Sequence, residues 1–309
     1  MKIVEKSAKK TNEFLRTFAF CERARDALGY ILDTENIGWK DKILLPAYIG
    51  WSPNEGSGVF DPVKQRKITP VFYKVDNNLH IDYADAIEKM KQEEIKVFVI
   101  IHYFGFVDSN YALLVEMAKK KGILIVEDAA HAFYSDFIGG ICGRKGDYTI
   151  YSLHKMFPFR SGGMLCINST NVRTNELKQY SNYGDPFRYD LLQISKKRIH
   201  NYNCLTKLLT SHFDRIKPLY KELPVGVVPQ TYPVKIIGYD RYELYKQMND
   251  AGWGFVSLYH TMIEQLRNSQ YKDSLELASC IMNLPVHQDV ASSKYEEMIG
   301  TMLKFMNCK

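Results

Sequence analysis

The ten residues Gly122–His131, GILIVEDAAH, decide how this chain of 309 residues folds. Ile123 to Glu127 predicts a buried strand, because a short apolar run bounded by polar residues suits the interior of a sheet. Gly122 stands where a helix before the strand would end, at a position that favours glycine. The strand closes with Glu127 and Asp128, so two carboxylates lie at its C-terminal edge, where open α/β sheets bind ligands.

On both sides of this strand, short apolar runs alternate with amphipathic stretches. The alternation predicts repeated strand-helix units and an α/β fold, in which helices cover both faces of a sheet. The predicted strands are Lys42–Pro46, Thr69–Val75, Lys96–His102, Ile123–Glu127, Tyr148–Leu153 and Gly163–Asn168. The predicted helices are Tyr83–Lys91, Tyr111–Lys121, Val172–Tyr180 and Leu191–Thr210.

Length and proline content predict two domains. At about 100–200 residues per domain, 309 residues suffice for two. Four prolines fall between Pro218 and Pro233, with Gly226 among them, and such breaker-rich stretches are typical of linkers. We therefore predict a large domain over residues 1–217 and a small C-terminal domain over residues 218–309.

The composition is that of an ordinary folded protein, with 46% hydrophobic and 25% charged residues, and it excludes a disordered or fibrous chain. The formal net charge is +6 at pH 7, but the basic residues are scattered along the chain. Short clusters such as Lys119 to Lys121 suit solvated helix ends better than a nucleic-acid-binding stripe. We expect no nucleic-acid partner, whereas an anionic small substrate fits the charge.

Membrane insertion and secretion are not expected. The longest apolar run, from Val97 through His102 to Val107, is far shorter than the roughly 18 residues of a spanning helix. No apolar segment of a secretory signal follows the charged N-terminal residues. The six cysteines form no CxxC pair, which argues against a zinc site or a disulfide framework. The predicted location is the cytoplasm, and no metal is expected.

A lysine and a serine complete the chemistry that Asp128 begins. Ser152 and Lys155 stand in the sequence SLHK after a predicted strand, and the glycine pair Gly162-Gly163 comes shortly after them. An acid, a lysine and a phosphate-holding serine together are the requirements of pyridoxal phosphate. The aldehyde of this cofactor bonds to a lysine amine, and a carboxylate keeps its pyridine nitrogen protonated.

Each predicted role has a physical reason. A carboxylate beside the ring nitrogen favours the electron-withdrawing pyridinium, and we assign this role to Asp128, with Glu127 as the second candidate. The amine of Lys155 has to be nucleophilic near pH 7, which burial achieves by lowering the pKa of a lysine. Ser152 would supply a hydroxyl to the phosphate, and an early helix that begins near Ala24 and Arg25 would supply N–H groups.

With these residues in place, the chain resembles the DegT/DnrJ/StrS family of sugar aminotransferases. The matching pieces extend over nearly the whole chain: LLPAY (Leu44–Tyr48), VFYKVDNNLHID (Val71–Asp82), VIIHYFG (Val99–Gly105), GILIVEDAAHAF (Gly122–Phe133), GDYTIYSLHK (Gly146–Lys155), SGGMLCIN (Ser161–Asn168), NYG (Asn182–Gly184) and LPVHQDV (Leu284–Val290). The resemblance implies the fold type I architecture of pyridoxal-phosphate-dependent transferases. This architecture has a mostly parallel central sheet flanked by helices, and a smaller C-terminal α+β domain.

The resemblance also implies further contacts with the cofactor. It places His131 near the ring, Tyr48 or Trp51 against one ring face, and Asn182 near the phosphate across a dimer interface. A homodimer with shared active sites is implied, because fold type I enzymes build their sites at subunit boundaries. From the residues alone, His131 could instead be a structural histidine, and Tyr48 and Trp51 could be core aromatics.

Three features depart from the family's pattern. Ser152 and Lys155 are three residues apart, whereas most members have a step of five. No GxNxR segment is recognisable in Asp185 to Lys197, and the chain is shorter than most members. The family's dehydratase branch carries histidine in place of the lysine, so Lys155 argues against that branch although His154 is adjacent.

Residues and resemblance together predict an aminotransferase that uses pyridoxal phosphate to transfer an amino group from glutamate or glutamine to a keto-sugar. The resemblance implies a nucleotide-linked sugar and a place in amino-sugar synthesis for cell-surface polysaccharides or secondary metabolites. Two alternatives stay open. One is a non-catalytic relative that binds the cofactor for a regulatory purpose, and the other is an aminotransferase with a non-sugar acceptor.

Overall fold

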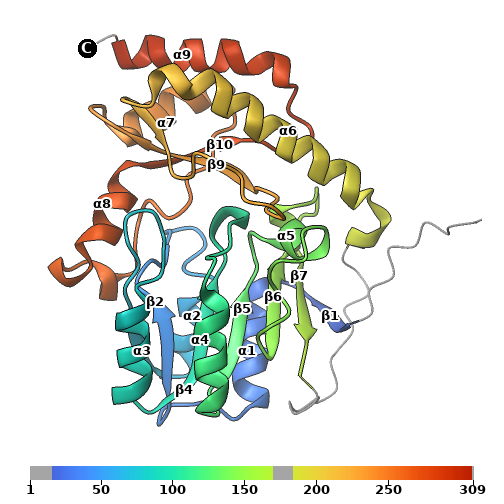
Figure 1. Ribbon diagram of the computed structural model, residues 1–309, viewed down its shortest axis with the longest axis vertical. Coiled ribbons are helices and arrows are strands. Elements are labelled where there is room, and N and C mark those ends of the chain that lie inside the picture. The colour runs from blue at the N-terminus through green and yellow to red at the C-terminus, as the bar shows by residue number, and fades with distance from the viewer. Residues whose placement is uncertain (1–15, 170–183, 308–309) are drawn as a thin grey trace, which may run out of the picture.

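The computed structural model describes residues 16–169 and 184–307 of the chain. Within these ranges, the larger sheet has seven strands in the order β1-β7-β6-β5-β4-β2-β3 (Figure 1). The strands from β6 to β3 run parallel, whereas β7 is antiparallel to both of its neighbours. They are β1 (Thr17–Cys21), β2 (Lys42–Pro46), β3 (Thr69–Tyr73), β4 (Ile95–Ile101), β5 (Leu124–Asp128), β6 (Tyr148–Ser152) and β7 (Gly163–Ile167).

The central strands are apolar because helices cover both faces of the sheet. In β4 and β5, the side chains of Val97, Val99, Ile125 and Val126 are fully buried. Figure 1 shows α3 and α4 before the sheet and α1 and α2 behind it. The helices of this part are α1 (Ala24–Thr34), α2 (Phe60–Gln65), α3 (Tyr83–Gln92), α4 (Tyr111–Lys120) and α5 (Phe133–Phe137).

The junction between α4 and β5 shows how local sequence sets the edge of the sheet. Gly122 has a φ of +67°, the left-handed conformation that glycine adopts readily after a helix. Its N–H donates to the Lys119 carbonyl at 3.0 Å, which ends α4 and turns the chain into β5. Because parallel strands end at the same edge of a sheet, Asp128 at the end of β5 and Ser152 at the end of β6 come together there.

A second sheet lies beside the first and is antiparallel, in the order β10-β9-β8 (Figure 1). Its strands are β8 (Ile216–Pro218), β9 (Thr231–Ile236) and β10 (Ile281–Pro285). The helices α6 and α9 pack against each other over this sheet. The four helices of this part are α6 (Leu191–Leu209), α7 (Arg241–Asp250), α8 (Lys272–Cys280) and α9 (Tyr295–Asn307). No helix within the described ranges is long and apolar enough to cross a membrane.

The predicted fold class is confirmed, and all six predicted strands are present with ends within two residues of the expected ones. The predicted helix over residues 172–180 lies outside the described residues. The strand β1 was not predicted, because its ladder depends on pairing with the distant β7 rather than on its own sequence. The predicted boundary between residues 217 and 218 falls within β8, and α6, which precedes it, packs on β9. The division into domains stays a prediction.

Candidate active site

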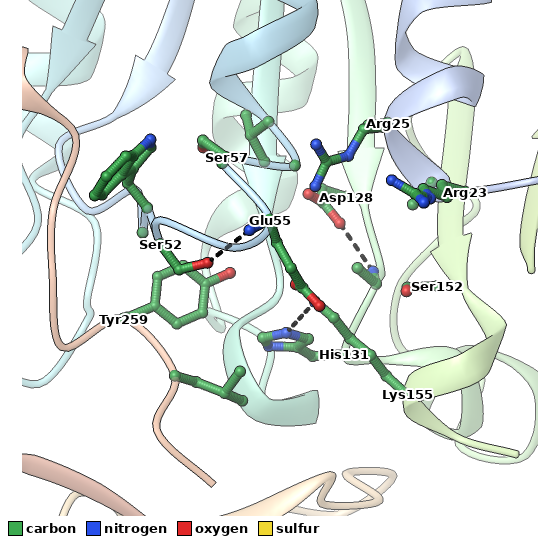
Figure 2. Close-up of a pocket in the computed structure, with 18 of the residues that line it drawn as sticks. Arg23, Arg25, Ser52, Glu55, Ser57, Asp128, His131, Ser152, Lys155 and Tyr259 are labelled. Atoms are coloured by element: carbon green, nitrogen blue, oxygen red, sulfur yellow. Dashed lines mark hydrogen bonds between the residues drawn. The ribbon is translucent and has the colours of Figure 1, made fainter. Parts of the chain in front are cut away.

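A cavity of about 790 Å³ opens at the edge of the sheet where β5 and β6 end. Five segments that are far apart in sequence line it, at residues 23–25, 49–59, 128–131, 150–161 and 257–260. Figure 2 shows Asp128, His131, Lys155 and Tyr259 around this space. The cavity is therefore assembled from the start of α1, the loop at residues 49–59, the edge of the large sheet and the segment 257–260, which follows the helix at residues 241–250.

Seven of the nine predicted site residues line the cavity: Ala24, Arg25, Trp51, Asp128, His131, Ser152 and Lys155. Asn182 lies outside the described residues. Tyr48 is fully buried beneath the cavity wall, where its hydroxyl donates to the Tyr259 carbonyl at 3.1 Å. The suggested contact of Tyr48 with the cofactor is therefore corrected to a core role, because Tyr259 stacks on its ring at 5.3 Å and covers it.

Lys155 and His131 meet inside the cavity. A single 3-10 turn after β6, η2 (Leu153–Lys155), carries the lysine, whose Nζ lies 3.0 Å from His131 Nε2 (Figure 2). Burial lowers the pKa of Lys155, although Asp128 and Glu55 partly oppose this effect. Burial also holds the pKa of His131 well below its ordinary value, and a proton on Lys155 would lower it further. Both shifts favour the neutral forms of the two side chains.

The backbone decides which nitrogen of His131 carries the proton. The Phe104 N–H donates to Nδ1 at 3.2 Å, so the proton of the neutral imidazole resides on Nε2. The Nε2–H group then donates to Lys155 Nζ, which can accept a hydrogen bond only as a neutral amine. The hydrogen-bond network thus assigns Lys155 an unprotonated, nucleophilic Nζ, which is the state that a cofactor-binding lysine requires.

Asp128 is buried at the end of β5, and its Oδ1 accepts the Ala130 N–H at 2.9 Å. Burial raises the pKa of Asp128, and the hydrogen bond from the Ala130 N–H offsets this only in part. A buried carboxylate of this kind gains stability from a cation beside it, and a protonated pyridine nitrogen is such a cation. The side chains of Asp128, His131 and Lys155 therefore fit the ring of pyridoxal phosphate.

The start of α1 has the features that a phosphate site requires. The helix begins after Arg23 with no capping side chain, and Ala24 and Arg25 of its first turn line the cavity. Exposed N–H groups at a helix start bind phosphate well. Gly163 of β7 allows α1 to begin close against the sheet, since a Cβ on residue 163 would lie 2.6 Å from the Ala24 nitrogen. Ser152 pairs with Gly163 in the sheet and lines the same cavity (Figure 2), so the residues at this end fit the phosphate of the cofactor.

Several residues that line the cavity were not among the site residues predicted from the sequence. Arg23 and Arg160 adjoin predicted residues, so sequence proximity could have found them. Tyr259 and Glu55 stand far from every predicted strand end, and only the tertiary structure brings them to Lys155. Arg25 forms an ion pair with Asp61 at 3.2 Å, and the same carboxylate accepts the Ser57 N–H at 3.0 Å. Asp61 thereby links the start of α1 to the loop at residues 49–59.

Glu127, the second candidate for the ring nitrogen, has a structural role. Its carboxylate accepts hydrogen bonds from His102 Nε2 at 2.8 Å and from the N–H groups of Gly143, Lys145 and Gly146 at 2.7 Å each. Burial opposes ionisation, but these bonds outweigh it and lower the pKa of Glu127 to about 2. Glu127 therefore anchors the glycine-rich turn after α5 and does not line the cavity.

Replacing Glu127 with glutamine is expected to lower the free energy of unfolding by about 3 kcal/mol at pH 7. The reason is that a pKa of about 2 against an ordinary value of 4.5 corresponds to roughly 1.4 kcal/mol per unit. In the wild type, this contribution is complete above about pH 4.5 and is lost as the pH falls toward 2, whereas the variant lacks it throughout.

Urea unfolding at pH 7 and at pH 3 measures both effects of Glu127→Gln. The matched control is Glu116→Gln, which removes an exposed carboxylate on α4 and should change neither value. Equal stability of the wild type and Glu127→Gln at pH 7 would contradict the anchoring role.

Comparison with known proteins places this site in a family. Residues 21–190, more than half of the chain, match the DegT/DnrJ/EryC1/StrS aminotransferase family. A GDP-perosamine synthase of Escherichia coli O157:H7 is 29% identical over 112 residues, which are 36% of this chain and 30% of that protein. A dTDP-4-amino-4,6-dideoxy-D-glucose transaminase of Shigella dysenteriae is 26% identical over 182 residues, which are 58% of this chain and 47% of that protein.

The chain thus spans less than half the length of the curated relatives that it matches. Among solved structures, the PLP-form of the putative sugar aminotransferase Spr1654 from Streptococcus pneumoniae is similar in fold, with a TM-score of 0.71 and 17% identity. That similarity covers 92% of this chain and 86% of the other. On the family match, the chain belongs to the DegT/DnrJ/EryC1/StrS aminotransferase family.

Proposed function

We propose that this chain is a pyridoxal-phosphate-dependent aminotransferase that moves an amino group from glutamate or glutamine to a nucleotide-linked keto-sugar. The observation that carries the proposal is the contact of 3.0 Å between His131 Nε2 and Lys155 Nζ, beside the buried Asp128. The family and the names of its sugar-transaminase relatives support the same reaction class.

One end of the cavity would hold the phosphate of the cofactor, and the other end would hold its ring. Ala24, Arg25 and Ser152 would hold the phosphate, and Asp128 would face the ring nitrogen. When bound, pyridoxal phosphate supplies an electron sink that makes a proton on the donor's α-carbon acidic. The neutral Nζ of Lys155 can accept that proton and return it, because its pKa is lowered by burial. The Nε2–H of His131 holds Nζ in place by its hydrogen bond.

The charge around the cavity suits anionic substrates. Arg23, Arg25 and Arg160 line it, against the carboxylates of Glu55 and Asp128. An amino-acid donor brings a carboxylate, and a nucleotide-linked sugar brings a diphosphate, and guanidinium groups bind both by paired hydrogen bonds. Because Arg25 pairs with Asp61, Arg23 and Arg160 are the guanidinium groups that favour a nucleotide-linked acceptor over a neutral ketone.

We also propose a homodimer with shared active sites. Fold type I architecture supports this assembly, and the proposed role of Asn182 at the partner's phosphate depends on it. Light scattering at micromolar concentration measures the mass, and a fully active monomer would contradict the shared site.

The function is tested by incubating the purified, cofactor-loaded protein with L-glutamate or L-glutamine and measuring release of the 2-oxo acid, one per site. Candidate nucleotide-linked keto-sugars are then added, and mass spectrometry follows the amino-sugar product. Amino transfer only to a non-sugar ketone would favour that alternative. Tight cofactor binding without reaction with any amino donor would favour a non-catalytic, regulatory relative.

A further inference from the structure

Tyr259 has a backbone conformation that only its surroundings can maintain. Its φ is +59°, in the left-handed region that bulky residues rarely enter. Such a conformation is strained and persists only where neighbouring contacts determine it. It occurs here in a residue that lines the cavity from the segment 257–260, on the side of the small sheet.

The large-sheet part of the chain supplies those contacts. The Trp51 N–H donates to the Thr261 carbonyl at 2.9 Å, and the Ile263 N–H donates to the Ile49 carbonyl at 3.0 Å. Between these bonds, Gly50 leaves room for the tyrosine, since a Cβ there would lie 3.1 Å from Tyr259 Cδ1. The Tyr48 hydroxyl holds the Tyr259 carbonyl from below at 3.1 Å. Three hydrogen bonds thus hold the backbone of the segment that carries Tyr259, and Gly50 leaves room for its ring.

The placed ring covers His131. The ring centroids of Tyr259 and His131 are 5.6 Å apart at an angle of 76°, so the two rings meet edge to face. Phe104 stacks on His131 at 5.8 Å and 20°, and it also meets Tyr259 edge to face at 5.9 Å. Figure 2 shows Tyr259 on the side of His131 that faces the segment 49–59. Two aromatic rings therefore enclose the imidazole, and His131 is only 2% exposed.

We propose that Tyr259 is a positioning residue that excludes water from His131 and thereby keeps it a neutral imidazole, whose one proton the Phe104 N–H leaves on Nε2, facing Lys155 Nζ. The inference rests on the proposed function for its consequence in catalysis, but not for its geometry. Without the ring, water would solvate the imidazole, which would then bind a second proton and lose its acceptor at Nδ1. A charged imidazole could no longer accept from the Phe104 N–H.

Several other ionisable groups lie around Tyr259 and His131. They are Lys155 from η2, Asp128 from β5, Tyr103 from η1 (Tyr103–Gly105), and Glu55 and Arg25 from the cavity wall. Burial, and after it the charge of Asp128, raises the pKa of Tyr259, so its phenol stays neutral. Removing the ring would therefore change the solvation of His131 and would not remove a charge beside it.

The test is ¹⁵N NMR of the histidines in the cofactor-free protein, with the His131 signal identified by its loss in His131→Gln. In the wild type and in Tyr259→Phe, we expect a single Nε2–H tautomer that does not titrate between pH 5 and pH 8. In Tyr259→Ala, we expect His131 to titrate within this range. Tyr271→Ala removes a ring that packs on Phe72 outside the cavity, and it should leave His131 unchanged.

A His131 that stays a non-titrating Nε2–H tautomer in folded Tyr259→Ala would overturn the proposal. If that variant does not fold, Tyr259→Gly is measured in its place, because glycine also removes the ring and readily adopts a φ of +59°, and the same two outcomes decide. Because the measurement needs neither cofactor nor substrate, a protein without aminotransferase activity but with the expected titration would refute the proposed function alone.

Discussion

Replacing Lys155 with alanine is expected to abolish amino transfer, by about four orders of magnitude or more. Lys155 is the one lysine that lines the cavity within the described residues, so no neighbouring amine can take over its proton transfer. Folding should be retained, because the side chain extends into a cavity and makes its hydrogen bond only to His131 Nε2 there. Release of 2-oxo acid from the amino donor measures the loss, and circular dichroism reports the fold.

The position of cofactor attachment gives an independent measurement. Borohydride treatment of the loaded wild type, followed by peptide mapping, should place the fixed cofactor on Lys155. The control is Lys145→Ala, which removes an exposed lysine whose backbone N–H alone contacts Glu127. Label on another lysine, or near wild-type activity of Lys155→Ala, would remove Lys155 from the catalytic role.

Replacing Asp128 with asparagine is expected to leave the cofactor bound but to reduce amino transfer by several orders of magnitude. Asparagine keeps the size of the side chain and can still accept the Ala130 N–H, so the end of β5 should not change shape. An amide cannot hold a proton on the ring nitrogen, because it carries no charge to favour the pyridinium. Steady-state rates and the equilibrium binding of the cofactor separate the two effects.

Glu127→Gln is the matched comparison for Asp128→Asn, since the two carboxylates are neighbours on the same strand. We expect Glu127→Gln to affect stability and Asp128→Asn to affect activity, because Glu127 bonds to His102 and three backbone N–H groups away from the cavity. Near wild-type turnover by Asp128→Asn would exclude it as the partner of the ring nitrogen.

Much of the fold and part of the candidate site could be predicted from local pattern. The strands β2 to β7 are short apolar runs bounded by breakers, and their ends were placed within two residues. The residues Asp128, Ser152 and Lys155 follow such strands directly, so their arrival at one edge is a consequence of parallel pairing. For these residues, local hydrophobic pattern and chain direction carry enough information.

The corrected assignment, that of Tyr48, depends on contacts between distant segments. Tyr48 and Trp51 are three residues apart in one loop, and no local pattern says which of them reaches the cavity. The answer comes from Tyr259, which is more than 200 residues away and covers Tyr48. The choice between Glu127 and Asp128 has the same origin. Consecutive strand residues face opposite sides of a sheet, so the sequence separates the two carboxylates but does not say which side holds the cavity.

By itself, the sequence determined the strands β2 to β7, the residues at their ends and the chemistry available there, because apolar runs, turns and residue types act through neighbours along the chain. The tertiary structure alone decided that His131 is enclosed by Phe104 and Tyr259, with its proton on Nε2. The physical reason is that burial and hydrogen-bond partners set the protonation of a side chain, and here both come from segments that meet only in the folded protein.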